Sequence, residues 1–133
     1  LPSHTDTDIM IEHVGSGTIF TGDNCFNLRM GRFDDSSSIS GTIAALEYVV
    51  EQNFAQVVPG HGPSGSPQDT LMPYLDYLRA LREAVAAGLE EELEDYEIKQ
   101  NILPDFAYLY DWSEFDSLFG RNVNKMFLEL EDF

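Results

Sequence analysis

The chain has 133 residues and a mass of 15.0 kDa, a size that predicts one compact domain. Hydrophobic residues make up 43% of it, enough for a packed interior and too many for a disordered protein. Only 7 Lys and Arg stand against 24 Asp and Glu, which gives a formal net charge of -17. Because nucleic acids and anionic membrane surfaces are also negatively charged, this balance excludes both as expected partners.

The sequence contains no segment that is expected to enter a membrane. No apolar run approaches the roughly 20 residues that a spanning helix needs, and residues 1–8 lack the basic and apolar regions of a signal peptide. We therefore expect a soluble protein. The lone Cys25 cannot form an internal disulfide and fits a cytoplasmic or a periplasmic location equally well. Since the chain begins with Leu1 rather than Met, we expect that preceding residues of a longer parent protein have been removed.

The first predicted elements are a hairpin and a helix. Short β-branched and aromatic runs at residues 9–14 and 18–22 predict two strands, which the glycines at positions 15 and 17 join as a hairpin. From Ile39 to Val50 the apolar residues recur at helical spacing. The serines at 36–38 offer an N-cap, so this stretch predicts an amphipathic helix.

A third strand is predicted at residues 56–59, directly before Gly60-His61-Gly62-Pro63. Two glycines and a proline are expected to end the strand, which would put His61 on a loop. Ser66 is then expected to cap a long amphipathic helix, with Pro67 in its first turn, and Gly88 is expected to end that helix.

The tail is the more acidic part of the chain. Residues 1–89 hold 11 acidic and 4 basic side chains, whereas residues 90–133 hold 13 and 3. The sequence of the tail predicts an acidic helix over 90–100 and a break at Pro104. A last helix is expected to begin with a capping box of Ser113 and Asp116. The element order is ββαβα followed by acidic helices, so we expect a mixed α/β (α+β) fold in which the 90–133 extension packs on the 1–89 unit.

Three residues with metal-binding side chains lie at the ends of these predicted elements. His4 precedes the first strand, Asp23 ends the second and His61 follows the third, so all three can point to one rim. Imidazole and carboxylate are suitable zinc ligands, and a carboxylate can bridge two metal ions with its two oxygens. The glycines beside Asp23 and His61 leave room to aim these side chains.

The same segments resemble the C-terminal half of the metallo-β-lactamase superfamily, in order and in spacing. The resemblance runs from Leu1 to about Val85. The tail matches only loosely, through Asn122-Val123 and the Leu-Glu-Leu-Glu ending at 128–131. These two segments are similar to the helical end of some zinc hydrolases of this superfamily. The matching segments are HTDTD at 4–8, IFTGD at 19–23 followed by Phe26, GR at 31–32 and VVPGHGP at 57–63.

By resemblance, His4 is a ligand of a first zinc ion, His61 is a ligand of a second, and Asp23 bridges both ions. Asp23 is thereby the expected catalytic residue, because it sets the spacing of the two metals. The family's other ligands come from an H-x-H-x-D-H segment in its N-terminal half, and this sequence has no such segment. The resemblance therefore implies that the chain is half of an αββα sandwich, with the acidic helices added to it.

The implied activity of the parent protein is hydrolysis of an ester, thioester, lactam or related bond in a small-molecule substrate. A dinuclear site would activate a hydroxide, with iron or manganese as alternatives to zinc. The fragment alone is expected to be inactive, to hold zinc incompletely or not at all, and to associate with itself or with the missing half through an uncovered sheet. The alternative is a non-catalytic α/β fragment or an acidic protein-interaction module.

Other polar and aromatic residues have simpler expected roles. His13 is expected to be an ordinary surface residue, and Cys25 is expected to be buried packing. The sequence is compatible with two roles for Asp6 and Asp8: they orient the His4 side chain, or they are simply solvated. The tail also holds aromatic residues that are either pocket walls or core, namely Tyr96, Phe106, Tyr108, Tyr110 and Trp112.

Overall fold

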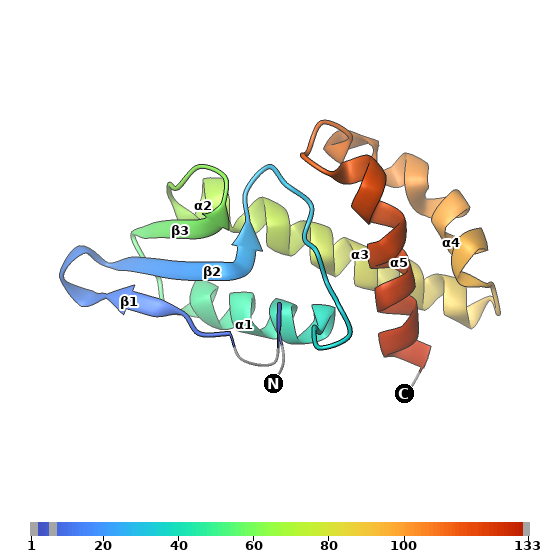
Figure 1. Cartoon of the computed structure of the whole chain (residues 1–133), viewed down its shortest axis with the longest axis horizontal. Helices are drawn as coiled ribbons and strands as arrows, with labels where there is room; N and C mark the ends of the chain where they lie inside the picture. Colours follow the sequence, from blue (N-terminus) through green and yellow to red (C-terminus); the bar gives the residue numbers. More distant parts are fainter. Residues whose placement is uncertain (1–2, 6–7, 132–133) are drawn as a thin grey trace.

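The computed structural model describes residues 3–5 and 8–131. It confirms a mixed α/β fold (Figure 1), with a three-stranded sheet toward one end of the molecule and the helices of the tail toward the other. Helix α3 (Met72–Glu90) extends from the sheet region to the tail and links the two. None of the helices in the described residues is long and apolar enough to cross a membrane.

The sheet contains the predicted hairpin, but its second strand runs over residues 18–26 and not only to Gly22, so the prediction that Asp23 lies at the end of that strand is wrong. Strand β1 (Ile11–His13) pairs antiparallel with β2 (Thr18–Phe26), and the short 3-10 helix η1 (Val14–Ser16) makes the turn between them. Gly17 has a φ of 63°, the left-handed conformation that favours glycine. Strand β3 (Gln56–His61) pairs with β2 in parallel, so the sheet order is β1-β2-β3.

The prediction that β3 ends at Pro59 is wrong. The strand continues through Gly60 to His61, where His61 pairs with Phe26 and its carbonyl oxygen accepts a hydrogen bond of 2.9 Å from the Asn27 amide. The register is shifted on both sides of the Gly22–Pro59 pair, and such irregular positions are where a sheet tolerates proline. His61 is therefore the last residue of a strand rather than a loop residue.

Helix α1 (Ile39–Glu51) is confirmed, including its serine cap. The Ser38 hydroxyl accepts a hydrogen bond of 2.9 Å from the Gly41 amide. The buried face of the helix packs on β2 and on α3, as its apolar periodicity predicts.

The long helix begins as predicted and ends later than predicted. Ser66 caps the short helix α2 (Pro67–Thr70), and α3 follows after one residue. Gly88 does not end α3, because the helix continues to Glu90. A Cβ on Gly88 would lie 2.5 Å from Cγ1 of Ile98, so the glycine permits close packing with the next helix instead of a helix end.

The tail forms further helices after α3. Helix α4 (Asp95–Ile102) has a reciprocal capping box, the 3-10 helix η2 (Leu103–Leu109) carries Pro104 in its first turn, and α5 (Phe115–Glu131) ends the described chain. The predicted capping role of Ser113 is wrong: α5 begins two residues later, and the backbone of Ser113 pairs instead with the loop after β2. That contact is a tertiary one, which a local capping pattern does not predict.

The tail is tied to the N-terminal part by apolar and polar contacts. Buried apolar residues from Ile19 to Met126 form one continuous core. The carboxylate of Glu129 on α5 accepts hydrogen bonds from the amides of Ile39 (2.7 Å) and Ser40 (3.0 Å), so it adds a second cap to α1. The amide nitrogen of Asn122 donates to the Gly31 carbonyl at 3.1 Å.

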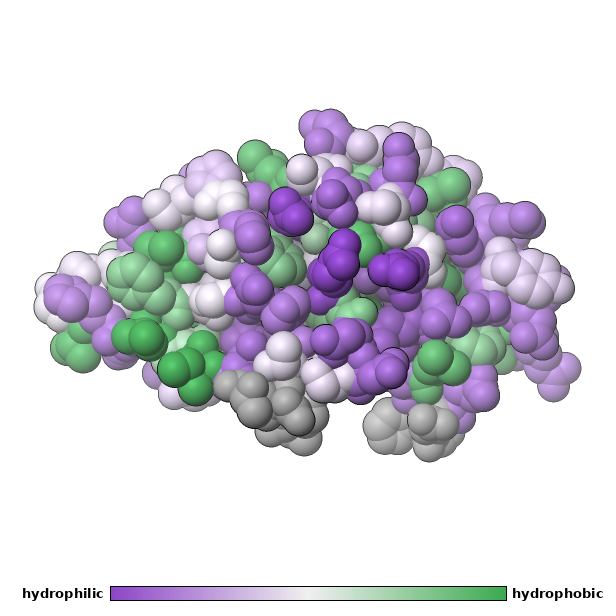
Figure 2. Space-filling model, viewed as in Figure 1, coloured by the Kyte–Doolittle hydropathy of each residue, from purple (hydrophilic) through white to green (hydrophobic). Residues whose placement is uncertain are grey.

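The hairpin carries exposed apolar side chains. Ile11 and Phe20 are cross-strand partners, and their side chains are 60% and 44% exposed. Ile9 and Val14 are exposed beside them, and Figure 2 shows apolar residues gathered at this end of the molecule. The described residues leave this apolar surface of the sheet uncovered.

Candidate metal centre

Strands β2 and β3 bring Asp23 and His61 together. Because the strands run parallel and Gly22 pairs with Pro59, the residues that follow reach the same end of the sheet. Nε2 of His61 lies 3.6 Å from Oδ1 of Asp23.

His4 reaches the same carboxylate from the segment before β1. Its backbone is anchored by Asn24, whose side-chain oxygen accepts from the His4 amide at 3.4 Å, and by Ser37, whose hydroxyl donates to the His4 carbonyl. Nε2 of His4 lies 3.6 Å from Oδ2 of Asp23. The structure therefore brings together all three residues predicted from the sequence, with one carboxylate oxygen facing each histidine.

An aromatic ring borders both imidazoles. The centroid of the Phe26 ring lies 5.8 Å from that of His4 and 5.1 Å from that of His61. The side chain of His4 is 18% exposed, whereas those of Asp23 and His61 are 42% and 48% exposed. The site is thus an apolar-backed rim that opens to solvent along Asp23 and His61.

The spacing of the three side chains fits ligands of zinc. Each nitrogen-to-oxygen distance of 3.6 Å exceeds that of a good hydrogen bond. It is close to the roughly 3.4 Å that separates two donors on one tetrahedral zinc ion with bonds of about 2.1 Å. Each half of the Asp23 carboxylate and its histidine are therefore spaced as two donors to one metal ion.

These residues do not complete a metal site. Within residues 3–5 and 8–131, no three His, Cys, Asp or Glu side chains are arranged to hold a metal ion between them. Asp23 and one histidine supply two donors, whereas zinc enzymes use about three protein ligands for each catalytic ion. Firm metal binding would need donors from outside the described residues.

Of the two roles left open for Asp8, orientation of the His4 ring is not seen within the described residues. Asp8 accepts hydrogen bonds from the Ser3 hydroxyl at 3.2 Å and from the Thr5 amide, so it holds the backbone around His4 and not the ring. Asp6, for which the same two roles were left open, lies outside the described residues. Nδ1 of His4 is buried and has no hydrogen-bond partner within the part of the chain that the structure describes.

Two glycines allow β3 to pass close to the site. A Cβ on Gly60 would overlap Oδ1 of Asp23 and would lie 2.7 Å from the Gly22 carbonyl oxygen. Gly62 has a φ of 90°, and a Cβ there would overlap the Asn27 carbonyl oxygen. Both glycines are therefore required by close backbone approach and not only by turn geometry.

His13 and Cys25 have the simple roles predicted for them. The exposed His13 ring hydrogen-bonds the Ser16 hydroxyl at 2.7 Å in the hairpin turn. Cys25 is fully buried, and burial raises the pKa of its thiol to about 12. Within the described residues, neither side chain forms a hydrogen bond or ion pair with His4, Asp23 or His61.

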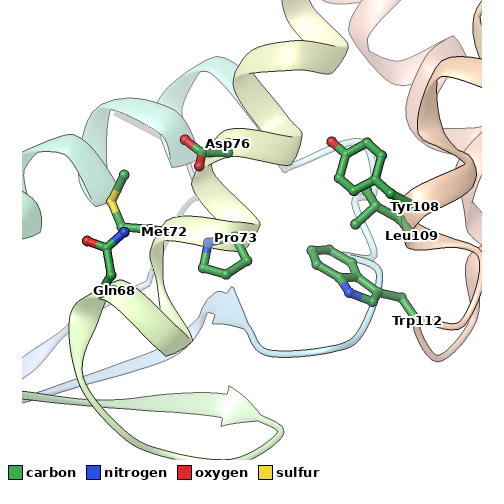
Figure 3. Close-up of a pocket in the computed structure, with 7 residues that line it drawn as sticks. All are labelled: Gln68, Met72, Pro73, Asp76, Tyr108, Leu109 and Trp112. Atoms are coloured by element: carbon green, nitrogen blue, oxygen red, sulfur yellow. The ribbon is translucent and has the colours of Figure 1, made fainter.

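The aromatic residues of the tail divide among core, pocket and exposed surface. Phe106 is buried, whereas Tyr96 and Tyr110 are exposed. Tyr108 and Trp112 line a pocket of about 390 Å³, where they face the start of α3 (Figure 3). None of the three candidate ligands lines it; its walls are Gln68, Met72, Pro73, Asp76, Tyr108, Leu109 and Trp112.

A smaller hollow of about 270 Å³ opens directly beside His61. Sequence reasoning missed it because one wall, Ser113, comes from the tail. Arg29 is one of two Lys or Arg residues in positions 1–78, but no local spacing in the sequence places it beside Ser113. The hollow is lined by Asn27, Leu28, Arg29, His61, Gly62, Pro63 and Ser113.

Comparison with protein-family models gave no match, and comparison with curated proteins gave none either. The assignment of a function therefore rests on the geometry around Asp23 and on the sequence motifs.

Proposed function

We propose that the chain is the C-terminal half of a dinuclear zinc hydrolase that resembles the metallo-β-lactamase superfamily. The observation that carries the proposal is the position of Asp23 between two imidazoles, with Oδ2 3.6 Å from Nε2 of His4 and Oδ1 3.6 Å from Nε2 of His61. A carboxylate that offers one oxygen to each histidine has the arrangement required of a bridging ligand.

Each residue has a distinct role in this proposal. Two bound zinc ions would supply a hydroxide at neutral pH and polarise the carbonyl of an ester, thioester, lactam or related substrate. Asp23 would hold both ions and so set their spacing. His4 and His61 would each add one nitrogen donor beside one carboxylate oxygen, and Phe26 packs against both imidazole rings.

The remaining ligands would come from a half that carries the H-x-H-x-D-H segment. The uncovered apolar side chains of Ile11 and Phe20 support such a partner, because two sheets of a sandwich bury their apolar faces against each other. In the absence of that half, we expect the chain to bind zinc weakly and to have no hydrolase activity, and we expect a second copy to cover the same surface.

An acidic interaction module is the second candidate. The net charge of -17 favours it, as does the absence, among the described residues, of three side chains arranged around one metal. Metal content separates the two candidates, because only the hydrolase needs a metal ion.

The direct test is elemental analysis of the proposed parent protein. We expect about two zinc ions per molecule and hydrolysis of a simple ester that is lost on chelation and restored by zinc. A parent protein that binds no zinc, iron or manganese, or whose hydrolysis survives complete removal of metal, would rule out this function and leave the interaction module.

A further inference from the structure

The pocket that Tyr108 and Trp112 line is built from two distant parts of the chain. The two aromatic residues come from the tail, whereas Pro73 and Asp76 come from the beginning of α3. Figure 3 shows the rings on one side of the pocket and the α3 side chains on the other, with the Tyr108 hydroxyl directed toward α3. The volume of about 390 Å³ lies in the range of small-molecule sites. None of the candidate metal ligands lines the pocket, so it is separate from the candidate metal centre.

Buried aromatic residues hold the two rings in place. The Tyr108 ring stacks on that of Phe106, with 22° between the ring planes and centroids 6.3 Å apart. The Trp112 ring packs edge-to-face with Tyr77, and their centroids lie 5.9 Å apart. Phe106 and Tyr77 both belong to the core. The aromatic wall of the pocket is therefore formed before a ligand arrives, which lowers the entropy cost of binding.

The pocket carries a negative charge. Among the described residues that line it, only Asp76 is charged, and its side chain is exposed. Arg79 lies 3.8 Å from the Asp76 carboxylate but is engaged more closely by Glu47, at 2.8 Å, so the charge of Asp76 is only partly compensated. Partial burial raises the pKa of the Tyr108 phenol, and the charge of Asp76 raises it further. The carboxylate is thus close enough to act on the aromatic wall.

We propose that this pocket binds a small organic cation that carries a quaternary ammonium group. The faces of tryptophan and tyrosine rings attract such a cation, and tryptophan does so most strongly. A quaternary ammonium has no N–H group that needs a hydrogen-bond acceptor, so it suits apolar walls such as Met72 and Leu109, while Asp76 supplies the opposite charge. The net charge of -17 favours the approach of cations. The inference does not depend on the proposed hydrolase function, because it concerns a separate pocket.

Trp112 is the single tryptophan of the chain, so its indole N–H NMR resonance reports on this pocket alone. The probes are choline and 3,3-dimethyl-1-butanol, which has the same shape with a carbon atom in place of the charged nitrogen. We expect choline to shift the indole resonance in a saturable way at constant ionic strength. Choline should bind roughly fivefold or more tightly than the neutral alcohol. Equal affinities of the two compounds, or no saturable shift with choline, would overturn the proposal.

Variants of two exposed pocket residues separate the carboxylate from the aromatic wall. Asp76→Asn should weaken choline binding roughly threefold or more and leave the affinity of the neutral alcohol within about twofold, because only the charge is lost. Tyr108→Leu should weaken choline binding by a similar factor, since the wall stays apolar but loses its aromatic face. The control Glu83→Gln removes the same charge from a part of α3 outside the pocket and should leave choline binding unchanged. Choline affinity that is the same in all three variants would contradict the proposed site.

A last comparison distinguishes a free cation from the same group on a protein. Trimethylated lysine side chains also carry a quaternary ammonium, so the second probe is a short peptide with one trimethyllysine. The volume of the pocket matches a small molecule, and we expect the peptide to bind no more tightly than choline. Tighter binding of the peptide would assign the pocket to a protein partner and overturn the proposal of a small-molecule site. Hydrolase activity enters none of these measurements, so failure of the proposed function would leave their outcome unchanged.

Discussion

A Cβ atom on Gly60 would overlap Oδ1 of Asp23, so β3 passes the carboxylate at a distance that only glycine permits. The neighbouring residue in the strand is His61, whose Nε2 lies 3.6 Å from the same oxygen. The close passage of β3 thus fixes the carboxylate and the imidazole relative to each other.

Gly60→Ala should therefore displace Asp23 and destabilise the sheet. A side chain forced against backbone and carboxylate atoms costs about 1–3 kcal/mol. We expect a loss of that size in the free energy of unfolding, measured by urea denaturation. The matched control is Gly65→Ala, because a Cβ there would lie 3.9 Å from the nearest atom, the Thr70 methyl carbon. Equal stabilities of the two variants would contradict the close approach.

Gly88→Ala tests the packing of the tail on α3. Alanine in a helix interior is normally about 1 kcal/mol more favourable than glycine. Here we expect the opposite sign, because the new Cβ would lie 2.5 Å from Cγ1 of Ile98. Thermal unfolding measures the change, and a double-mutant cycle with Ile98→Ala should show that the penalty disappears when the larger side chain is removed. A stabilising Gly88→Ala would mean that α4 does not pack here.

Local patterns predicted the strands and helices, whereas tertiary contacts decided their ends. Gly88 has the appearance of a helix terminator in the sequence, but its role is set by Ile98, ten residues later. The serine at 113 resembles a helix cap, yet its partners are Leu28 and Met30. Such contacts join distant segments, so no local spacing contains them.

The candidate site was also predictable only in part. The predicted element ends and the resemblance of the motifs together identified His4, Asp23 and His61, although β2 continues beyond Asp23 to Phe26. The hollow beside His61 was not predictable, since Arg29 and Ser113 meet only through the packing of the tail.

The buried thiol of Cys25 is expected to make the free energy of unfolding depend on pH. Burial raises the pKa of its thiol from 9.0 to about 12, so between these values the folded state keeps a proton that the unfolded state has lost. Stability is therefore unaffected by this group below about pH 9 and falls as the pH rises toward 12. Cys25→Ala should reduce the slope of unfolding free energy by up to about 1.4 kcal/mol per pH unit in that window. Urea midpoints at a series of pH values measure it, and identical slopes would contradict the burial of the thiol.

The exposed apolar surface of the hairpin predicts self-association of the chain. Light scattering should show particles larger than 15 kDa as concentration rises. Ile11→Lys should reduce this association, because Ile11 is 60% exposed and pairs across the strands with the exposed Phe20. The control Tyr48→Lys changes an exposed residue of α1 and should have little effect. A monodisperse 15 kDa particle across a wide concentration range would show that the surface needs no partner.

The most direct test of the proposed metal centre is the zinc content of the parent protein after His61→Ala. The His61 side chain is 48% exposed, so its loss should change the melting temperature of the metal-free protein little. Zinc should fall from about two ions per molecule toward one, and activity should fall by orders of magnitude. His13→Ala, which removes an exposed hairpin histidine, should leave both unchanged. Full zinc content and activity in His61→Ala, or loss of both in His13→Ala, would contradict the assignment of His61 as a metal ligand.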